Sequence, residues 1–297
     1  MHYISTRNNK DKYIFEEILL KGLADDGGLF IPNEVPTISQ SDMQDILVMD
    51  YKSIAIRLIK LFTQDTFSDD LLEKMVHEAY ESFNNNKITP LINLDENTSI
   101  LELYHGPTLA FKDIAMQLLS RMIEEVLSKN NSRASIICAT SGDTGGAAVA
   151  SFADKENIDL YVLFPKDKIS EVQRRFMSTS QANNINIISI DGNFDDCQNI
   201  VKSLFKDKAF SQSVHLTAVN SINWARIMIQ IIYYFSAISQ NPEYKKNPDI
   251  IVPTGNFGDI YAGYIAKKMG LEMGKLVIAT NVNNILERCL NTGRYNI

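Results

Sequence analysis

The chain has 297 residues, 45% of them hydrophobic and 22% charged, with a formal net charge of −7. This length corresponds to about two domains and is enough to bury a sizeable core. The near-average composition excludes a disordered, collagen-like or disulfide-rich protein, and 29 Lys and Arg against 36 Asp and Glu exclude an overall basic field for nucleic acid.

The first ninety or so residues are predicted to be mainly helical. Helical periodicity covers residues 12–21, 53–63 and 68–83, and Ser68 followed by two aspartates is typical of a helix start. The segment GLADDGGLFIP, residues 22–32, separates the first two helices, because three glycines and a proline do not fit a helix interior.

After Leu101, short runs rich in β-branched residues alternate with helical patterns. This alternation is typical of a parallel sheet covered by helices on both faces, so we predict an α/β fold. The expected strands are 135–139, 160–164, 187–190, 215–219, 250–253 and 276–280, and the expected helices are 113–127, 145–153, 170–180, 195–206, 222–238 and 259–269.

The cysteines and the apolar stretches indicate a cytoplasmic protein that neither enters a membrane nor binds a metal. The three cysteines are far apart and lack CxxC spacing, and an odd number fits a reducing compartment. The first twelve residues contain no apolar segment typical of a signal peptide. The most apolar stretch, residues 227–238, is too short for a membrane span and contains Gln230 and Ser236, so we expect a core helix.

Three loops lie where parallel sheets bind ligands, beyond a strand end and at a helix start. The first, residues 105–113 (HGPTLAFKD), places Lys112 at a helix N-terminus. The positive partial charge there and partial burial both lower the pKa of an amine, which favours a neutral nucleophile suited to a Schiff base. The alternative is a surface lysine that extends into water.

The second loop, residues 139–148 (ATSGDTGGAA), joins a strand to a helix rich in small residues. Free backbone N–H groups at such a helix start favour an anion such as a carboxylate. The loop lacks both the Gly-Lys-Ser/Thr ending of a P-loop and the dinucleotide G-x-G-x-x-G spacing. A tight turn with Asp143 or Thr144 as the helix cap is the alternative.

The third loop, residues 253–259 (PTGNFGD), again connects a strand to a helix. Gly255, Asn256 and Gly258 permit unusual backbone angles, so that successive N–H groups can converge on a phosphate, although a structural turn explains them equally well. Taken together, the three loops supply a nucleophilic lysine, an anion site and a phosphate site. These are the parts needed to hold pyridoxal phosphate and an amino-acid substrate.

The three loop sequences, in this order, resemble the pyridoxal-phosphate enzymes of the tryptophan synthase β class (fold type II), and within that class the threonine synthase family. The opening GLADDGGLFIP is typical of threonine synthases and is lacking in cysteine synthases and threonine dehydratases. DGNFDD, residues 191–196, and NSINWARI, residues 220–227, also match. The resemblance covers essentially the whole chain.

The resemblance implies two parallel-sheet, three-layer domains and a helical N-terminal segment. Residues 1–97 would form that segment, residues 98–112 with 214–297 the larger cofactor domain, and residues 113–213 the smaller α/β domain. It also implies a pyridoxal-phosphate-dependent lyase that converts O-phospho-L-homoserine and water to L-threonine and phosphate. No nucleic-acid or membrane partner is implied, and the oligomeric state stays open.

The resemblance also assigns roles to residues. Lys112 would bind the cofactor covalently and then carry protons, with one deprotonation at Cα, a second at Cβ that expels phosphate from Cγ, and addition of water at Cβ. The cofactor phosphate would be held by Gly255, Asn256, Phe257, Gly258 and Asp259. The substrate carboxylate would be bound by Ser141, Gly142, Asp143, Thr144 and Gly145. The substrate phosphate has weaker candidates in Asn220, Ser221, Asn223, Arg226, Lys166 and Lys168.

Among the charged candidates we favour Arg226, because a guanidinium is well shaped for phosphate; the alternative for Arg226, Lys166 and Lys168 is solvated surface charge. Threonine synthases usually continue far beyond the position of Ile297, and that part completes the large domain and supplies a Ser or Thr to the pyridine nitrogen. Without it, helix 222–238 and the strands at 250 and 276 are expected to leave an apolar patch exposed. The alternatives are therefore a truncated relic that binds without turnover, another fold type II lyase and, far behind, a dinucleotide-dependent oxidoreductase.

Overall fold

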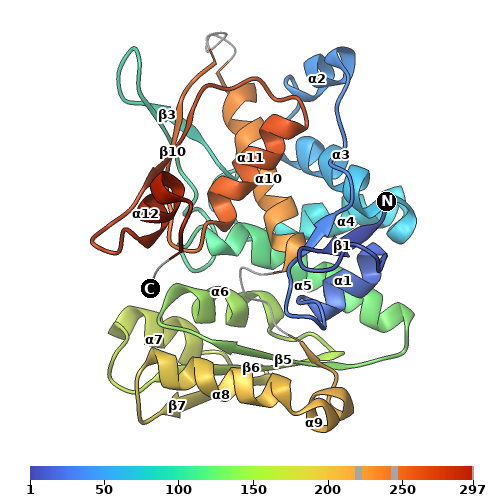
Figure 1. Ribbon diagram of the computed structural model, residues 1–297, viewed down its shortest axis with the longest axis vertical. Coiled ribbons are helices and arrows are strands. Elements are labelled where there is room, and N and C mark those ends of the chain that lie inside the picture. Colours follow the sequence, from blue (N-terminus) through green and yellow to red (C-terminus); the bar gives the residue numbers. More distant parts are fainter. Residues whose placement is uncertain (218–222, 242–246, 296–297) are drawn as a thin grey trace.

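The computed structural model describes residues 1–217, 223–241 and 247–295. Its N-terminal part is mainly helical (Figure 1), and a small antiparallel pair of strands, β1 with β2, joins the start of the chain to the end of the turn-rich segment 22–32. The elements of this part are β1 (Tyr3–Ser5), α1 (Phe15–Lys21), β2 (Phe30–Pro32), α2 (Gln40–Ile46), α3 (Tyr51–Thr63), the 3-10 turn η1 (Gln64–Thr66) and α4 (Asp69–Ala79).

The helix boundaries in this part show where backbone contacts override periodicity. Helix α1 begins at Phe15 rather than at residue 12, because Tyr13 exchanges two backbone hydrogen bonds with Tyr3, of 2.8 and 2.9 Å. Ser68 caps α4 as predicted, with its side chain accepting a hydrogen bond from the backbone of Leu71. The sequence pattern does not predict α2, because its seven residues bury only Ile46 and therefore carry no apolar stripe.

A four-stranded, all-parallel sheet forms the centre of the second half of the molecule, in the order β7-β6-β5-β8. Helix α6 covers one face and α8 the other (Figure 1), which confirms the predicted α/β class. Each expected strand of this sheet is present, with ends shifted by at most two residues among those described. The elements are β5 (Ala134–Ala139), α6 (Asp143–Phe152), β6 (Ile158–Pro165), α7 (Glu171–Ser178), β7 (Ile185–Ile190), α8 (Phe194–Lys206), α9 (Lys208–Ser213) and β8 (Leu216–Thr217).

The sheet order creates a position at which ligands are expected. The connection from β5 leads to β6 on one side, whereas β8 lies on the other side of β5. The crevice beyond the carboxyl ends of two such strands is where open α/β sheets bind ligands. The loop that follows β5 is the predicted anion loop, so the topology brings it to this crevice.

A second pair of parallel strands, β9 with β10, lies beside helices α10 and α11. The expectation of an exposed apolar patch is wrong for the helix, because α3, α5 and α11 cover α10 and every residue from Trp224 to Ser236 is buried. The strands do keep an apolar face outward, with Ile251 67% and Val277 39% exposed. The elements are β3 (Leu91–Asn93), β4 (Ser99–Leu101), α5 (Lys112–Lys129), α10 (Trp224–Ser239), β9 (Ile250–Pro253), α11 (Gly258–Lys268), β10 (Leu276–Ala279) and α12 (Ile285–Thr292).

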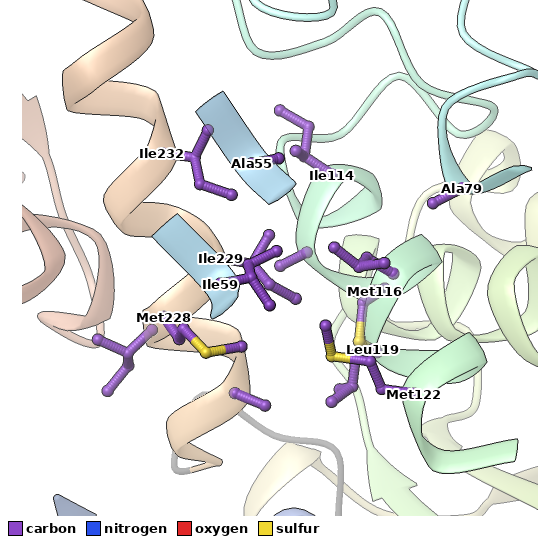
Figure 2. Close-up of a cluster of buried hydrophobic side chains, with 14 of the residues drawn as sticks. Ala55, Ile59, Ala79, Ile114, Met116, Leu119, Met122, Met228, Ile229 and Ile232 are labelled. Atoms are coloured by element: carbon purple, nitrogen blue, oxygen red, sulfur yellow. The ribbon is translucent and has the colours of Figure 1, made fainter. Parts of the chain in front are cut away.

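The largest core lies where α3, α5 and α10 meet. Figure 2 shows Ile59 of α3, Met116 and Leu119 of α5 and Ile229 of α10 pointing toward one another, and each of the four is 0% exposed. Such close packing fixes the position of α5 relative to α10, and with it the residue at the start of α5, which is Lys112. Among the described residues, no helix is long and apolar enough to span a membrane.

Asn223 connects the N-terminal layer to α10. Its side chain is fully buried, accepts a hydrogen bond from the backbone of Ala225 and donates one to the carbonyl of Leu19, both at 3.0 Å. Replacing Asn223 with Ala removes a helix cap and leaves a buried carbonyl unpaired, so the free energy of unfolding is expected to fall by about 2–3 kcal/mol in urea denaturation.

The matched control is Asn193→Ala, which removes the exposed cap of α8. That change alone is expected to cost about 1 kcal/mol. Equal losses for the two variants would contradict the role given to the bond between Asn223 and Leu19.

Candidate active site

Lys112 is the first residue of α5, and its side chain is only 21% exposed. Its Nζ lies 4.4 Å from the centre of the Phe111 ring and 3.7 Å from Oδ2 of Asp143. Burial lowers the pKa of Lys112, the Asp143 carboxylate partly opposes this, and the Arg226 guanidinium lowers it further. A surface lysine in water does not describe this side chain, whereas an amine with an increased neutral fraction does.

Asp113 holds the loop that precedes Lys112, and the sequence analysis missed it. Its side chain is 0% exposed, and its two oxygens accept hydrogen bonds from the backbone and the hydroxyl of Thr108, at 2.8 and 2.6 Å. Burial raises the pKa of Asp113, and the bonds from Thr108 oppose that rise. A Cβ on Gly106 would lie 2.5 Å from the Cβ of Asp113, so this turn requires glycine there. The sequence feature that could have indicated these hydrogen bonds is a threonine five residues before an aspartate.

Thr140 organises the loop between β5 and α6. Its Oγ1 accepts hydrogen bonds from the backbone N–H groups of Gly142 and Gly145, both at 3.0 Å. The N-cap is Gly142, without a side-chain cap bond, so the alternative of Asp143 or Thr144 as cap is wrong. The structure describes no hydrogen bond from the N–H groups of Ser141, Asp143 and Thr144 to any described residue, so these three can receive an anion.

The glycines of α6 serve the packing of α7. A Cβ on Gly145 would lie 2.3 Å from Sδ of Met177, and one on Gly146 would lie 3.1 Å from Cβ of Phe176. The small residues therefore allow α7 to lie directly on the start of α6. This contact, rather than the approach of a ligand, explains the small residues at these two positions.

Helix α7 also supplies Gln173, a second residue that sequence reasoning missed. Its Nε2 donates a hydrogen bond of 2.8 Å to Oδ1 of Asp143, whose other oxygen is the one near Lys112. A cavity of about 290 Å³ lies between Thr108, Gly142, Asp143 and α7. The start of α6, the loop before Lys112 and α7 thus enclose one space.

The loop from β9 to α11 ends in a left-handed residue. Phe257, at φ 67°, directly precedes Gly258, the first residue of α11. The carboxylate of Asp259 accepts hydrogen bonds from Thr254 Oγ1 at 2.6 Å and from Ile260 N at 2.9 Å, and so closes the turn on itself. Among the described residues, the N–H groups of Gly258 and Asp259 have no hydrogen-bond partner, and a Cβ on Gly255 would meet nothing within 4 Å.

The candidates for the substrate phosphate fall into four groups. Arg226 is only 3% exposed, in the first turn of α10, so the alternative of solvated charge is wrong for it; burial lowers the pKa of its guanidinium. Lys166 and Lys168 are exposed, as that alternative predicts. Asn223 is accounted for as a buried helix cap. Asn220 and Ser221 lie outside the described residues.

The fold and these loops define a class of enzyme. A lysine with a lowered pKa, an N–H-rich helix start beyond a parallel strand and an open glycine loop at a second helix start are brought together here. Residues 84–297 match the family profile described as pyridoxal-phosphate dependent enzyme, and residues 2–80 match the profile described as threonine synthase N terminus. The chain is therefore a member of the pyridoxal-phosphate-dependent enzymes.

Similarity to individual proteins narrows this class. The chain is 46% identical over 295 residues to a threonine synthase of Pseudomonas aeruginosa, with 99% of this chain and 63% of that protein covered. A pyridoxal-phosphate-bound threonine synthase structure from Brucella melitensis is similar at a TM-score of 0.94 and 47% identity, covering 100% of this chain and 64% of that one. For an Escherichia coli threonine synthase structure the values are 0.89 and 33%, with 100% and 68% covered. The chain belongs to the threonine synthase family, and it spans less than two thirds of the length of curated relatives from Pseudomonas aeruginosa, Schizosaccharomyces pombe and Saccharomyces cerevisiae.

The residues present fit pyridoxal phosphate. An aldehyde needs a neutral amine, and Lys112 has the lowered pKa that favours one. A phosphate needs N–H donors that the protein does not itself use, and the start of α11 supplies those of Gly258 and Asp259 beside the open space at Gly255.

Proposed function

We propose that this chain carries the cofactor and substrate sites of a threonine synthase, which converts O-phospho-L-homoserine and water to L-threonine and phosphate. The observation that carries the proposal is the position of Lys112 in a chain of this family, partly buried beside Asp143 and with its pKa lowered by Arg226. The substrate is a small molecule, so no nucleic-acid partner is needed. We also propose a cytoplasmic location, which the three free cysteines support.

Lys112 is proposed as the covalent attachment point of pyridoxal phosphate, and the loop Gly255–Asp259 as the site of its phosphate group. When bound, this cofactor withdraws electrons from Cα of an attached amino acid and so makes the Cα proton acidic. Within the loop, Gly258 and Asp259 act through their backbone N–H groups, because the Asp259 carboxylate is engaged with Thr254. Asn256 and Phe257 shape the turn that presents them.

The start of α6 is proposed to bind the substrate carboxylate. Of the five residues expected there, Ser141, Asp143 and Thr144 supply N–H groups, whereas Gly142 and Gly145 keep theirs on Thr140 and hold the turn in shape. Arg226 is proposed to attract the anionic end of the substrate and to keep Lys112 partly neutral. Asn220 and Ser221 remain further candidates for that end.

Lys112 is also proposed to move protons during the reaction. A neutral amine beside Cα accepts the Cα proton, and the lowered pKa makes the resulting ammonium group a stronger acid, which favours return of the proton. The division into residues 1–97, 98–112 with 214–297, and 113–213 is kept as a proposal, with the substrate between the last two. Closure of that space would exclude water until the leaving group has departed.

The pH dependence of cofactor attachment tests the pairing of Lys112 with Asp143. Because the carboxylate raises the pKa of Lys112 against the effect of burial, Asp143→Asn is expected to lower that pKa further. The pH midpoint for the initial rate of adduct formation with pyridoxal phosphate, recorded by absorbance, should therefore move to lower pH. Asp191→Asn, which changes an exposed carboxylate, should leave the midpoint where it is. A shift to higher pH would contradict the pairing.

Turnover by the 297-residue chain tests the function. The purified chain is incubated with pyridoxal phosphate and O-phospho-L-homoserine, and the released phosphate and the L-threonine are measured together. Equal amounts of both products are expected. When L-serine or L-threonine is offered instead, the amount of 2-oxo acid formed should be far less than the amount of L-threonine formed from O-phospho-L-homoserine. An adduct without product would contradict the proposed activity of this chain while leaving the cofactor site intact.

A further inference from the structure

Helix α10 carries a polar stripe although it is buried on all sides along most of its length. Arg226, Gln230 and Tyr234 follow one another at intervals of four residues and so lie on one face of the helix. Arg226 acts on the pKa of Lys112, and the hydroxyl of Tyr234 donates a hydrogen bond of 2.7 Å to the carbonyl of Asp259. The stripe therefore runs from the lysine to the first turn of α11.

Gln230, in the middle of this stripe, has a side-chain oxygen without a partner among the described residues. Its side chain is 4% exposed, and its Oε1 is buried without a hydrogen bond to any residue that the structure describes. Gln240, at the end of the same helix, shows what a structural glutamine does here: it accepts from the backbone of Leu91 at 3.0 Å and donates to the carbonyl of Thr89 at 2.8 Å. A buried amide without a hydrogen-bond partner lowers the stability of the fold. This favours a ligand that supplies the missing hydrogen bond.

The carboxamide of Gln230 faces the start of α11. A Cβ placed on Gly258 would lie 3.7 Å from Oε1 of Gln230. The N–H groups of Gly258 and Asp259 there have no hydrogen-bond partner among the described residues, and the residue before them is left-handed Phe257. Rotation about the last side-chain torsion of Gln230 exchanges Oε1 with Nε2 and so presents an N–H donor to the same space.

We propose that the carboxamide of Gln230 is a direct ligand of the phosphate group of pyridoxal phosphate, donating from Nε2 beside the N–H groups of Gly258 and Asp259. This rests on the proposed function, which places that phosphate at the start of α11. The phosphate would be bound between a helix N-terminus and a neutral amide that is already buried. A positively charged side chain is not needed, since the helix start supplies positive potential.

The test compares the affinities of wild-type chain and Gln230→Met for pyridoxal phosphate and for pyridoxal, which lacks the phosphate. Affinity is read from quenching of Trp224, the only tryptophan, which lies at the start of the same helix. Q230M is expected to weaken binding of pyridoxal phosphate by about 10- to 100-fold and to leave binding of pyridoxal unchanged. Gln230→Glu should weaken pyridoxal phosphate further, because it sets a negative charge against the phosphate.

Two further measurements keep the outcome interpretable. The melting temperature of the cofactor-free Q230M protein should equal or exceed that of wild type, since an unpaired buried amide is removed. Gln240→Met, which removes a glutamine with structural partners, should lower the melting temperature and leave the affinity for pyridoxal phosphate unchanged. Unchanged affinity of Q230M for pyridoxal phosphate, or an equal loss for both ligands, would overturn the assignment of Gln230 and leave the proposed function standing. Failure of the wild-type chain to form an adduct would overturn the proposed function and this inference together.

Discussion

Replacing Lys112 with Ala is expected to abolish covalent attachment of pyridoxal phosphate. The side chain supplies the only amine that the structure places between the starts of α5 and α6 among the described residues, and its pKa is lowered by burial and by Arg226. The visible absorption band of the adduct should be lost, and borohydride should leave no label on the peptide that contains residue 112. Formation of L-threonine should fall by at least about 10³-fold, since both attachment and proton transfer are lost.

The control for this experiment is Lys166→Ala, which removes an exposed lysine at the end of β6. That variant should keep the absorption band and the label on residue 112. A borohydride-stable label that persists in K112A at a single other lysine would contradict the assignment. The packing of α5 against α4 and α10 does not depend on the Lys112 side chain, so the variant is expected to fold.

Replacing Asp113 with Ala is expected to lower the free energy of unfolding by about 3 kcal/mol. Both carboxylate oxygens are buried and accept hydrogen bonds from Thr108, so the change leaves a buried N–H group and a hydroxyl without partners. The same bonds set the loop that leads into Lys112, so affinity for pyridoxal phosphate should fall as well. Urea denaturation and a cofactor titration measure the two effects.

Asp113→Asn separates geometry from charge. Its Oδ1 can accept from the Thr108 N–H and its Nδ2 can donate to the Thr108 hydroxyl, so its stability should lie within about 1 kcal/mol of wild type. Burial raises the pKa of Asp113 above the unfolded value, so the unfolded chain loses this proton first as pH rises. Wild type should therefore lose stability relative to D113N as pH rises between the two pKa values. The opposite slope would contradict the raised pKa.

The parallel sheet and the order of the loops could be predicted from the sequence, because short runs of β-branched residues and turn glycines report local conformation directly. β9 is present at the expected residues, and Lys112, Asp143 and Gly258 each begin a helix. The short elements could not be predicted in this way. β1 and β2 pair across the chain, and Ile4 lies opposite Ile31, 27 positions away, which no local period encodes.

The use of individual polar groups was beyond sequence reasoning. The sequence predicts Gly142 and Gly145 as N–H donors to an anion, whereas in the structure both N–H groups donate to Oγ1 of Thr140. The sequence predicts Asn223 as a candidate phosphate ligand, whereas in the structure its side chain donates a hydrogen bond to the carbonyl of Leu19 in the N-terminal layer. In each case the competing partner comes from the tertiary fold or from the detailed shape of a turn.

The sequence by itself therefore determined the α/β class, the family and the lysine that carries the proposed chemistry, because these depend on local pattern and residue type. Only the tertiary structure decided which groups remain available for a ligand. Burial and contacts between distant elements set the lowered pKa of Lys112, the buried charge of Arg226 and the unpaired amide of Gln230. Such properties depend on which atoms exclude water from a group, and those atoms lie on helices far from it in the chain.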